Sequence, residues 1–334
     1  MNRVYIFPYA DTSKSISKNP YINDLVESLR HNFIIVNEHK ANTRGIFDIF
    51  SYIFKIDYLY LNWIENLQFR RFGYIQALFF IILVPFFKYL RIEIIWTLHN
   101  KYTHSQKKYM LNRILTKLLI YNSDYIITHS SEGISFIQKI SLENLKKVKY
   151  LPHPIKNRII KRVENPAIDI LIWGSIDPYK GIHDFLNYLF VNHKESLYNI
   201  HIVGKFSSRN YYKQLMAFSA AKIKIQNKYI TNVEVEEYIR NSKVVLFTYN
   251  SRSILSSGAL MDTLSYGAQI IGPNIGAFKD MQKLGLIKTY NHYEEIIDIL
   301  NHISDIGQDN KCLLRFIENN GWNDFSCKIL KLIN

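Results

Sequence analysis

A stretch rich in serine and glycine in the last third of the chain could bind a diphosphate. It reads YNSRSILSSGALMDTLSYGAQIIGPNIG over residues 249–276, and it follows a strand pattern and begins a helical one. Ser256, Ser257 and Gly258 fall at the expected helix start, where free N–H groups and the positive end of the helix dipole favour an anion. Asp262 lies about one turn further on the same face, where its carboxylate could accept hydrogen bonds from a ribose diol. The alternative is that the serines only cap the helix and that Asp262 faces solvent.

A second stretch, WGSIDPYKG at residues 173–181, combines a glycine with a cation. Gly174 ends a strand pattern and allows a ligand to approach the backbone closely. Lys180 could place a positive charge on a phosphate, and Arg252 could supply a second one. Taken alone, this pattern also occurs by chance, and a surface role explains Arg252 equally well.

Histidines at or near expected strand ends could accept a proton. His99 and Asn100 end one strand, at the edge where doubly wound sheets bind their ligands. A hydroxyl that acts as a nucleophile must lose its proton, and histidine accepts protons near neutral pH. His99 is therefore a candidate base, with substrate positioning and a structural role as the alternatives, and His104 could orient a substrate. For His129 and His153, which end comparable strands, interdomain packing is the better interpretation.

Strand patterns alternate with helical patterns along the chain, which is typical of parallel α/β layers. The expected strands are 3–8, 33–36, 58–62, 93–98 and 125–129 in the first half, and 169–174, 199–204, 222–226, 244–249 and 269–272 in the second. The expected helices are 20–30, 73–90, 109–120, 132–140, 182–190, 211–221, 233–240, 255–266, 293–302 and 313–319. We therefore expect an α/β chain of two doubly wound, Rossmann-like domains, residues 1–155 and 167–320. The polar, proline-bounded segment between them suits a linker at 156–166.

Glycine placement assigns any nucleotide to the second half. The first strand–helix turn, PYADTSKSISKNPY, contains no glycine, so the dinucleotide-binding fingerprint is absent there. Ten of the 13 glycines lie beyond residue 160.

The positive charge is concentrated in the first half. The 334 residues carry a formal net charge of +14; residues 1–160 hold 22 Lys and Arg against 11 Asp and Glu, and residues 161–334 hold 20 against 17. A basic half can face nucleic acid or an anionic membrane leaflet, but the chain has no recognition-helix, zinc-finger or RNA-binding signature. The uncharged run at 72–87, FGYIQALFFIILVPFF, is too short to span a bilayer. It is either a buried core helix or a helix that rests in a membrane interface.

Composition excludes several classes of protein. Hydrophobic residues make up 48% and charged residues 21% of the chain, which excludes disorder and collagen-like repeats. Two cysteines, Cys312 and Cys327, make neither a disulfide framework nor a zinc site. The first residues lack the pattern of a signal peptide. We therefore expect a cytoplasmic protein with reduced thiols.

The order of these motifs resembles the GT-B glycosyltransferases, particularly the family 4-like enzymes of bacterial capsule, exopolysaccharide and lipopolysaccharide synthesis. The segments that carry the resemblance are IIWTLHNKYTH (94–104), SDYIITHSSEG (123–133), VKYLPHPI (148–155), GSIDPYKGI (174–182), IVG (202–204) and the stretch at 249–272. The resemblance implies two domains that face a central cleft. It also implies a nucleotide-sugar donor in the second domain and a glycan or glycolipid acceptor in the first, near Asn100 and His104.

The resemblance also assigns individual donor residues. Lys180 matches the family lysine, and Ser175 stands close to a position where many relatives have an arginine. Tyr229 and Ile230 lie where relatives hold the nucleobase. The backbone of 256–258 and Arg252 would then share the binding of the diphosphate.

Two further features follow from the resemblance. Many relatives carry two glutamates in the last motif; Asp262 matches the second, and the first would fall at Ile254. Trp322 and residues 323–332 resemble the final helix that returns to the first domain, so we expect that helix at 321–334, with a plain terminal helix as the alternative. GT-B relatives generally need no catalytic metal, and this chain has no Asp-x-Asp triplet.

We therefore expect a metal-independent hexosyltransferase without a cofactor. Its donor would be a nucleotide-diphosphate sugar, with UDP the commonest carrier in the family, and its acceptor a glycan or lipid-linked oligosaccharide of surface polysaccharide synthesis. The basic first domain would contact an anionic membrane surface, which places the protein in the cytoplasm or at the inner face of the membrane, and nucleic acid is not an expected partner. The alternatives are an inactive GT-B homologue in an assembly complex and a nucleotide-sugar epimerase.

Overall fold

The computed structural model describes residues 1–9, 20–38, 44–102, 109–250, 253–303 and 310–334. The chain forms two compact units, each built on its own parallel sheet. The first unit comprises Met1–Pro154, Ser253–Ser256 and Asn320–Asn334, and the second comprises Ile155–Arg252 and Ser257–Asn319. The two sheets confirm the expected α/β class with two doubly wound domains.

The sheet of the first unit has the strand order β2-β1-β3-β4-β5-β6, and every pair is parallel. Its strands are β1 (Asn2–Phe7), β2 (Phe33–Ile35), β3 (Tyr58–Asn62), β4 (Glu93–Leu98), β5 (Tyr125–Thr128) and β6 (Val148–Tyr150). Its helices are α1 (Tyr21–Leu29), α2 (Gly73–Tyr89), α3 (Tyr109–Asn122), α4 (Ser131–Ile140) and α12 (Trp322–Ile333), with short 3-10 segments η2 (Gly45–Ser51), η3 (Ile64–Phe69) and η5 (Glu143–Lys147).

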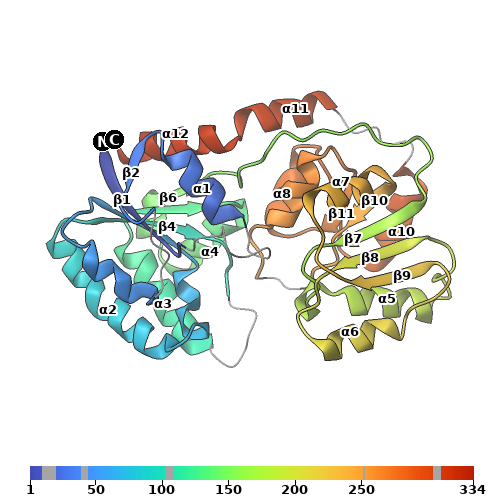
Figure 1. Cartoon of the computed structure of the whole chain (residues 1–334), viewed down its shortest axis with the longest axis horizontal. Helices are drawn as coiled ribbons and strands as arrows, with labels where there is room; N and C mark the ends of the chain where they lie inside the picture. Colours follow the sequence, from blue (N-terminus) through green and yellow to red (C-terminus); the bar gives the residue numbers. More distant parts are fainter. Residues whose placement is uncertain (10–19, 39–43, 103–108, 251–252, 304–309) are drawn as a thin grey trace. The chain divides into compact units, whose positions relative to one another are not determined.

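Alternate residues of these strands enter two separate apolar cores. Tyr5 and Trp96 pack with α2, α3 and α4 on one face, whereas Ile6 and Ile95 pack with α1 and α12 on the other. Figure 1 shows α2 and α3 on one side of this sheet and α1 and α12 on the opposite side. Because successive strand residues point to opposite faces, a strand covered on both faces must be apolar throughout. This explains the continuous apolar runs in the sequence.

The sheet of the second unit has the order β12-β11-β10-β7-β8-β9, again all parallel. Its strands are β7 (Ile168–Trp173), β8 (Ile200–Gly204), β9 (Ile223–Asn227), β10 (Ser242–Leu246), β11 (Ile270–Pro273) and β12 (Lys288–Tyr290). Its helices are α5 (Ile182–Val191), α6 (Arg209–Met216), α7 (Asn232–Arg240), α8 (Gly258–Ser265), α9 (Gly276–Lys283), α10 (Tyr293–Asn301) and α11 (Asn310–Asn319), with η6 (Pro178–Lys180). The strand order reverses between β7 and β10, and doubly wound sheets bind ligands outside the carboxyl ends of the strands at such a switch point.

The segment 156–166, for which the sequence suggests a linker, contains no helix or strand. It is nevertheless bound to the second unit. The backbone N–H of Arg158 donates to the carbonyl of Ser265 over 3.1 Å, and that of Ile160 donates to Tyr266 over 3.3 Å. The segment therefore follows the end of α8 as part of the second unit.

The C-terminal helix α12 belongs to the first unit, where it packs on α1. Phe325 and Ile329 are buried in the same apolar core as Leu25 of α1. The side-chain amide of Asn32 also donates to the Ser326 hydroxyl over 2.9 Å.

Helix α2, which contains the uncharged run, is apolar on opposite faces. Phe80 and Phe87 are buried in the core, whereas Ile75, Leu78 and Ile82 are 60%, 60% and 65% exposed. A core role therefore explains one face of this helix only. Within the described residues, no helix is both long enough and apolar enough to cross a membrane.

Candidate active site

The turn after β7 brings two glycines into close contact at the switch point of the second sheet. Gly174 adopts a left-handed φ of 105°, which suits glycine because other residues rarely adopt it. A Cβ on Gly204, at the end of β8, would lie 1.7 Å from the Gly174 carbonyl oxygen. Only a residue without a side chain fits at Gly204, so the ends of β7 and β8 pack backbone against backbone. At Gly174 itself, the one atom within 4 Å of a Cβ position is the Nζ of Lys180, which leaves room for a ligand beside that ammonium.

Lys180 lies beside this turn with its side chain buried. The residue is 6% exposed, and its Nζ lies 3.4 Å from the position that a Cβ on Gly174 would take. No described residue forms an ion pair with this ammonium. Its Nζ faces the Tyr249 ring, whose centroid lies 5.7 Å away. A buried charge without a counter-charge is costly. An anion bound next to Gly174 would remove that cost.

The backbone around Lys180 is fixed by the end of β10. The Lys180 carbonyl accepts a 2.6 Å hydrogen bond from the Thr248 hydroxyl. Gly181 follows with a φ of 67°, and a Cβ there would lie 2.3 Å from the Thr248 carbonyl oxygen. The Tyr249 ring stacks on that of Tyr179, with centroids 5.9 Å apart. These contacts hold Lys180 from both sides of the switch point.

Helix α8 begins at Gly258, with Ser257 as its N-cap. The Ser257 hydroxyl accepts a 3.2 Å hydrogen bond from the Leu260 N–H and lies 3.3 Å from the Tyr249 hydroxyl. The first N–H groups of a helix have no partner within the helix, so this end of α8 can bind an anion as well as cap itself.

In the first unit, three histidines form a buried aromatic cluster at the carboxyl ends of β4, β5 and β6. His99 is stacked on Trp63, with centroids 4.3 Å apart and planes at 18°. The Tyr21 ring makes edge contacts with His99, His129 and His153, at 4.9, 5.7 and 5.2 Å between centroids. All three histidines are less than 10% exposed.

The hydrogen bonds fix the tautomers of two of these rings. His99 Nε2 donates to the Asn62 side-chain oxygen over 3.0 Å, so Nδ1 keeps its lone pair. His129 Nδ1 donates to the Leu151 carbonyl over 2.8 Å. The remaining His129 nitrogen therefore accepts the 3.0 Å hydrogen bond from the Tyr21 hydroxyl.

Burial keeps the histidines neutral. It lowers the pKa of His99 well below the usual 6.5, and the neighbouring imidazoles lower it further. Burial lowers the pKa of His129 to about 3 and that of His153 to about 4. A base with so low a pKa accepts a proton weakly at neutral pH. The lowered pKa therefore favours a role for His99 as a hydrogen-bond acceptor that positions a hydroxyl, rather than a role as a general base.

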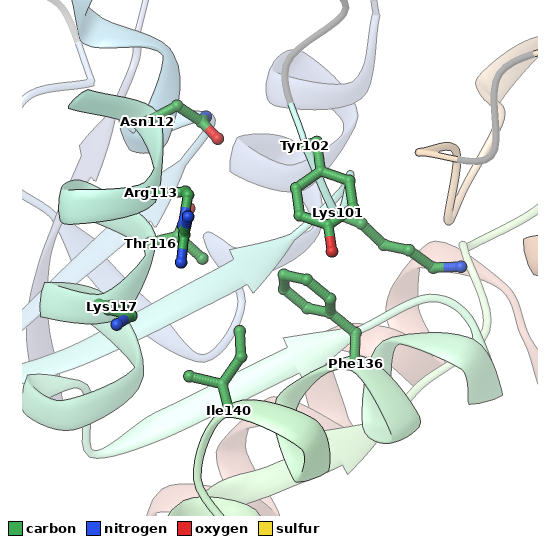
Figure 2. Close-up of a pocket in the computed structure, with 8 residues that line it drawn as sticks. All are labelled: Lys101, Tyr102, Asn112, Arg113, Thr116, Lys117, Phe136 and Ile140. Carbon is green, nitrogen blue, oxygen red and sulfur yellow. The ribbon is translucent and has the colours of Figure 1, made fainter. Parts of the chain in front are cut away.

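A cavity of about 250 Å³ opens between α3 and α4 of the first unit. Figure 2 shows Asn112, Arg113, Thr116 and Lys117 on the α3 side, with Tyr102, Phe136 and Ile140 opposite. The rings of Tyr102 and Phe136 meet edge to face at 5.4 Å. Asn112 donates its amide to the Glu65 carbonyl over 2.9 Å, while its side-chain oxygen is buried without a partner among the described residues. The cavity thus offers aromatic surface, cations and a free acceptor.

Comparison with known proteins identifies the fold. No family model and no curated protein sequence matches the chain. Among solved structures, Anabaena HepE in complex with UDP-glucose has a TM-score of 0.69 at 11% identity, over 99% of this chain and all of that one. Sucrose-phosphate synthase from Thermosynechococcus elongatus has a TM-score of 0.71 at 12% identity, over 99% and 98%. The lipopolysaccharide outer core galactosyltransferase WaaB has a TM-score of 0.65 at 13% identity, over 100% and 99%. The chain has the GT-B fold.

Two expectations for the last motif change in this GT-B structure. Ser256 does not start α8, because it lies in the segment Ser253–Ser256 of the first unit. In that segment the Lys101 N–H donates to the Ser253 carbonyl over 2.8 Å, and Ile254 forms an antiparallel bridge with Asn100. The sequence predicts that Asn100 contacts the acceptor. In the structure its backbone pairs with this segment.

Asp262 does not simply face solvent. Its carboxylate accepts a 3.3 Å hydrogen bond from Arg158, whose guanidinium also lies over the Tyr266 ring at 5.5 Å. Arg158 could not be selected from the sequence, because it stands in the expected linker more than 100 positions from its partner.

The remaining predicted donor residues are more exposed. Ser175 is exposed beside Gly174, and Ile230 is half-buried. Tyr229 is 55% exposed, with Lys205 Nζ 5.3 Å above its ring. Arg252 and His104 lie outside the described residues.

The histidine cluster packs differently from what the sequence suggests. His129 and His153, for which interdomain packing was the better interpretation, contact residues of the first unit itself. The ring centroids of His153 and Trp322 lie 6.1 Å apart, and those of His129 and Phe325 lie 5.8 Å apart. Helix α12 therefore covers this side of the GT-B N-terminal unit.

Proposed function

We propose that the chain is a glycosyltransferase whose second unit binds a nucleotide-diphosphate sugar. The observation that carries this proposal is the buried ammonium of Lys180 at the switch point, which lies beside Gly174 and forms no ion pair with any described residue. A diphosphate supplies the missing counter-charge, and the start of α8 supplies N–H donors at the same end of the sheet.

The same groups would serve the chemical step. When the bond between the sugar and the diphosphate breaks, negative charge accumulates on the leaving phosphate. Lys180 and the first N–H groups of α8 are fixed before the reaction by Thr248 and Ser257. They would stabilise this charge without reorganisation, in the role that a metal ion fills in other transferases. We therefore propose a metal-independent transfer.

Solved structures of the same fold support a UDP-hexose as donor. HepE was solved with UDP, with UDP-glucose, and with UDP and glucose. WaaB is a galactosyltransferase. We propose the same class of donor here, with Tyr229 and Ile230 near the base and Asp262, oriented by Arg158, near the ribose.

The acceptor belongs to the first unit in this proposal. The cavity in Figure 2 combines features that suit a sugar: Tyr102 and Phe136 offer aromatic surface, and the Asn112 oxygen can accept from a hydroxyl. His99 would position the attacking hydroxyl. We propose a glycan or lipid-linked oligosaccharide of bacterial surface polysaccharide synthesis, met at the anionic inner face of the membrane.

One residue favours a second candidate. Ile254 stands where relatives have a glutamate. It is 3% exposed, and its backbone bridges that of Asn100 within the first unit. A GT-B protein without that carboxylate could bind a nucleotide sugar in an assembly complex without transferring it. An epimerase would instead turn over the nucleotide sugar with no second substrate.

A nucleotide panel followed by product analysis tests the proposal. Thermal unfolding is measured with UDP, GDP, ADP and CMP and with their common sugar conjugates, and nucleotide release is then measured with and without lipid-linked acceptors. Stabilisation by one nucleoside diphosphate, with release that depends on an acceptor, supports transfer. Binding without release supports the inactive homologue, and release of free sugar without an acceptor supports the epimerase. If no nucleotide stabilises the chain, the donor site is wrong.

A further inference from the structure

The outer face of α2 is an apolar stripe with no charged residue between Arg71 and Lys88. Large side chains recur along it at every third or fourth position, which places them on one side of the helix. The stripe comprises Tyr74, Ile75, Leu78, Ile82, Phe86 and Tyr89, all of them exposed in the first unit. Soluble proteins rarely expose so many contiguous apolar side chains without a binding role.

The stripe does not contribute to the core of the first unit. Residues on the opposite face of α2, such as Phe80, Val84 and Phe87, already fill that core and are at most 1% exposed. Figure 1 shows α2 on the outside of its unit, with the sheet on the other side of the helix. Folding of the unit therefore explains the inner face and leaves the outer face unexplained.

A second surface feature, a lysine groove, lies next to the end of α2. It is a cavity of about 550 Å³ along the edge strand β6, and five lysines contribute to its lining: Lys146, Lys147, Lys149, Lys328 and Lys331. The one carboxylate in the lining, Asp124, is already bound to Lys88 of α2 over 2.6 Å. The groove thus has a large excess of positive charge.

The crowding of these cations is unfavourable in the free protein. The nearby ammonium groups of Lys88 and Lys146 add to burial in lowering the pKa of Lys147. Like charges held together in this way are stabilised when an anion binds between them. Phosphate groups are anions of suitable size and charge.

The ion pair between Lys88 and Asp124 joins the two features. Tyr89 ends the apolar stripe next to Lys88, and Asp124 is part of the lysine groove. A surface with an apolar stripe beside a cluster of lysines matches a lipid interface, where acyl chains and anionic headgroups lie next to each other.

We propose that this surface docks the first unit onto an anionic lipid membrane. The stripe of α2 lies in the interface plane with its apolar side chains among the acyl chains, and the lysine groove binds lipid phosphates. This inference rests on the membrane contact in the proposed function and specifies its residues. It requires no catalytic step, so it can be tested without donor or acceptor.

Vesicle co-sedimentation tests the proposal. The protein is spun with vesicles of phosphatidylcholine alone and with vesicles containing about one third phosphatidylglycerol. Two double variants are compared with wild type. The first, called the apolar arm, carries Leu78→Glu and Ile82→Glu, and the second, called the charge arm, carries Lys146→Gln and Lys149→Gln. Matched controls in the second unit are Val233→Glu, at a residue 76% exposed, and Lys224→Gln, at an exposed position on β9.

Wild type should sediment with anionic vesicles and stay in the supernatant with neutral ones. The apolar arm should lower the partition coefficient at least tenfold, because it withdraws two large apolar side chains from the interface. The charge arm should lower it about fivefold for each lysine. Both controls should bind like wild type, and all variants should keep the thermal unfolding temperature, since the changed residues are exposed.

Three outcomes would overturn the proposal. In the first, wild type stays in the supernatant with anionic vesicles. In the second, the apolar arm binds as well as wild type, which would mean that the contact is purely electrostatic and that any polyanion could make it. The third concerns the oligomeric state. A wild-type dimer without lipid that Ile82→Glu converts to a monomer would make the stripe an interface between copies of this chain. Stabilisation by nucleotide is measured on the same variants. If it persists while vesicle binding fails, the docking surface is wrong and the donor site is unaffected.

Discussion

Replacement of Lys180 by methionine tests the donor site most directly, because it should affect the free and bound protein differently. The ammonium is buried and pairs with no carboxylate in the part of the chain that the structure describes, so its removal takes away a desolvation cost in the free protein. Methionine keeps most of the volume of the side chain beside Gly174 and Tyr249. We expect the free energy of unfolding of the free Lys180→Met variant to be equal to or greater than that of wild type.

The bound protein should lose stability instead. A hydrogen bond from a charged donor contributes about 1.5–3 kcal/mol, which corresponds to a loss of about 10- to 150-fold in affinity for a nucleoside diphosphate. Wild type at 100 times its dissociation constant gains about 2.7 kcal/mol. With a 30-fold weaker constant, the variant at the same concentration gains about 0.9 kcal/mol. At about 2–4 °C per kcal/mol for a domain of 150–250 residues, the expected shifts are about 5–10 °C and about 2–4 °C.

Differential scanning fluorimetry with and without nucleotide measures both effects, and Lys224→Met at an exposed position of β9 is the matched control. A full nucleotide shift in Lys180→Met would show that the ammonium does not contact the diphosphate. A strongly destabilised free variant would show that the lysine has a structural partner, and the argument from its unpaired charge would then fail.

Three other predictions concern stability and pH. Gly204→Ala should lower the free energy of unfolding by about 3 kcal/mol or more, because the alanine Cβ would lie 1.7 Å from the Gly174 carbonyl oxygen. Urea unfolding measures this loss. A loss of less than about 1 kcal/mol would contradict the close contact. The three clustered histidines stay neutral in the folded protein but bind protons near pH 6.5 in the unfolded chain. Their contribution to the free energy of unfolding should therefore be complete above pH 6.5 and fall as the pH drops toward 4. The expected loss is up to about 1.4 kcal/mol per pH unit for each histidine. A His129→Gln variant should show a shallower slope. Burial raises the pKa of Glu65 to about 7, so that carboxyl costs stability as pH rises from about 4.5 through 7. Glu65→Gln should therefore be more favourable at pH 8 than at pH 5, and an equal effect at both would refute the shift.

The pattern of apolar runs was sufficient to predict ten of the strands and the fold class. The strands that it missed, β6 and β12, have three residues each and lie at sheet edges. A three-residue strand is too short to show a period, and an edge strand is held by its neighbour rather than by its own sequence. Pairing with β5 and β11 therefore decides both.

The donor motif was visible in the sequence because its parts are local. Gly174 and Lys180 lie six positions apart on one turn, and Ser257 directly precedes the helix that it caps. Their chemistry depends on residue type and short spacing, so they could be selected before the structure was known. Asp262 was selected for the same reason, but its partner Arg158 was not, since nothing in the local pattern joins residues 104 positions apart.

By itself, the sequence determined which segments are apolar on both sides, where glycine permits a tight turn, and which half carries the positive charge. Only the tertiary structure decided that Lys180 is buried and has no ion-pair partner among the described residues. It also decided that His129 and His153 pack under α12. It also decided that the outer face of α2 stays exposed beside five lysines. Local patterns encode propensity and period, whereas burial and partners depend on contacts between distant segments that form only when the sheets assemble.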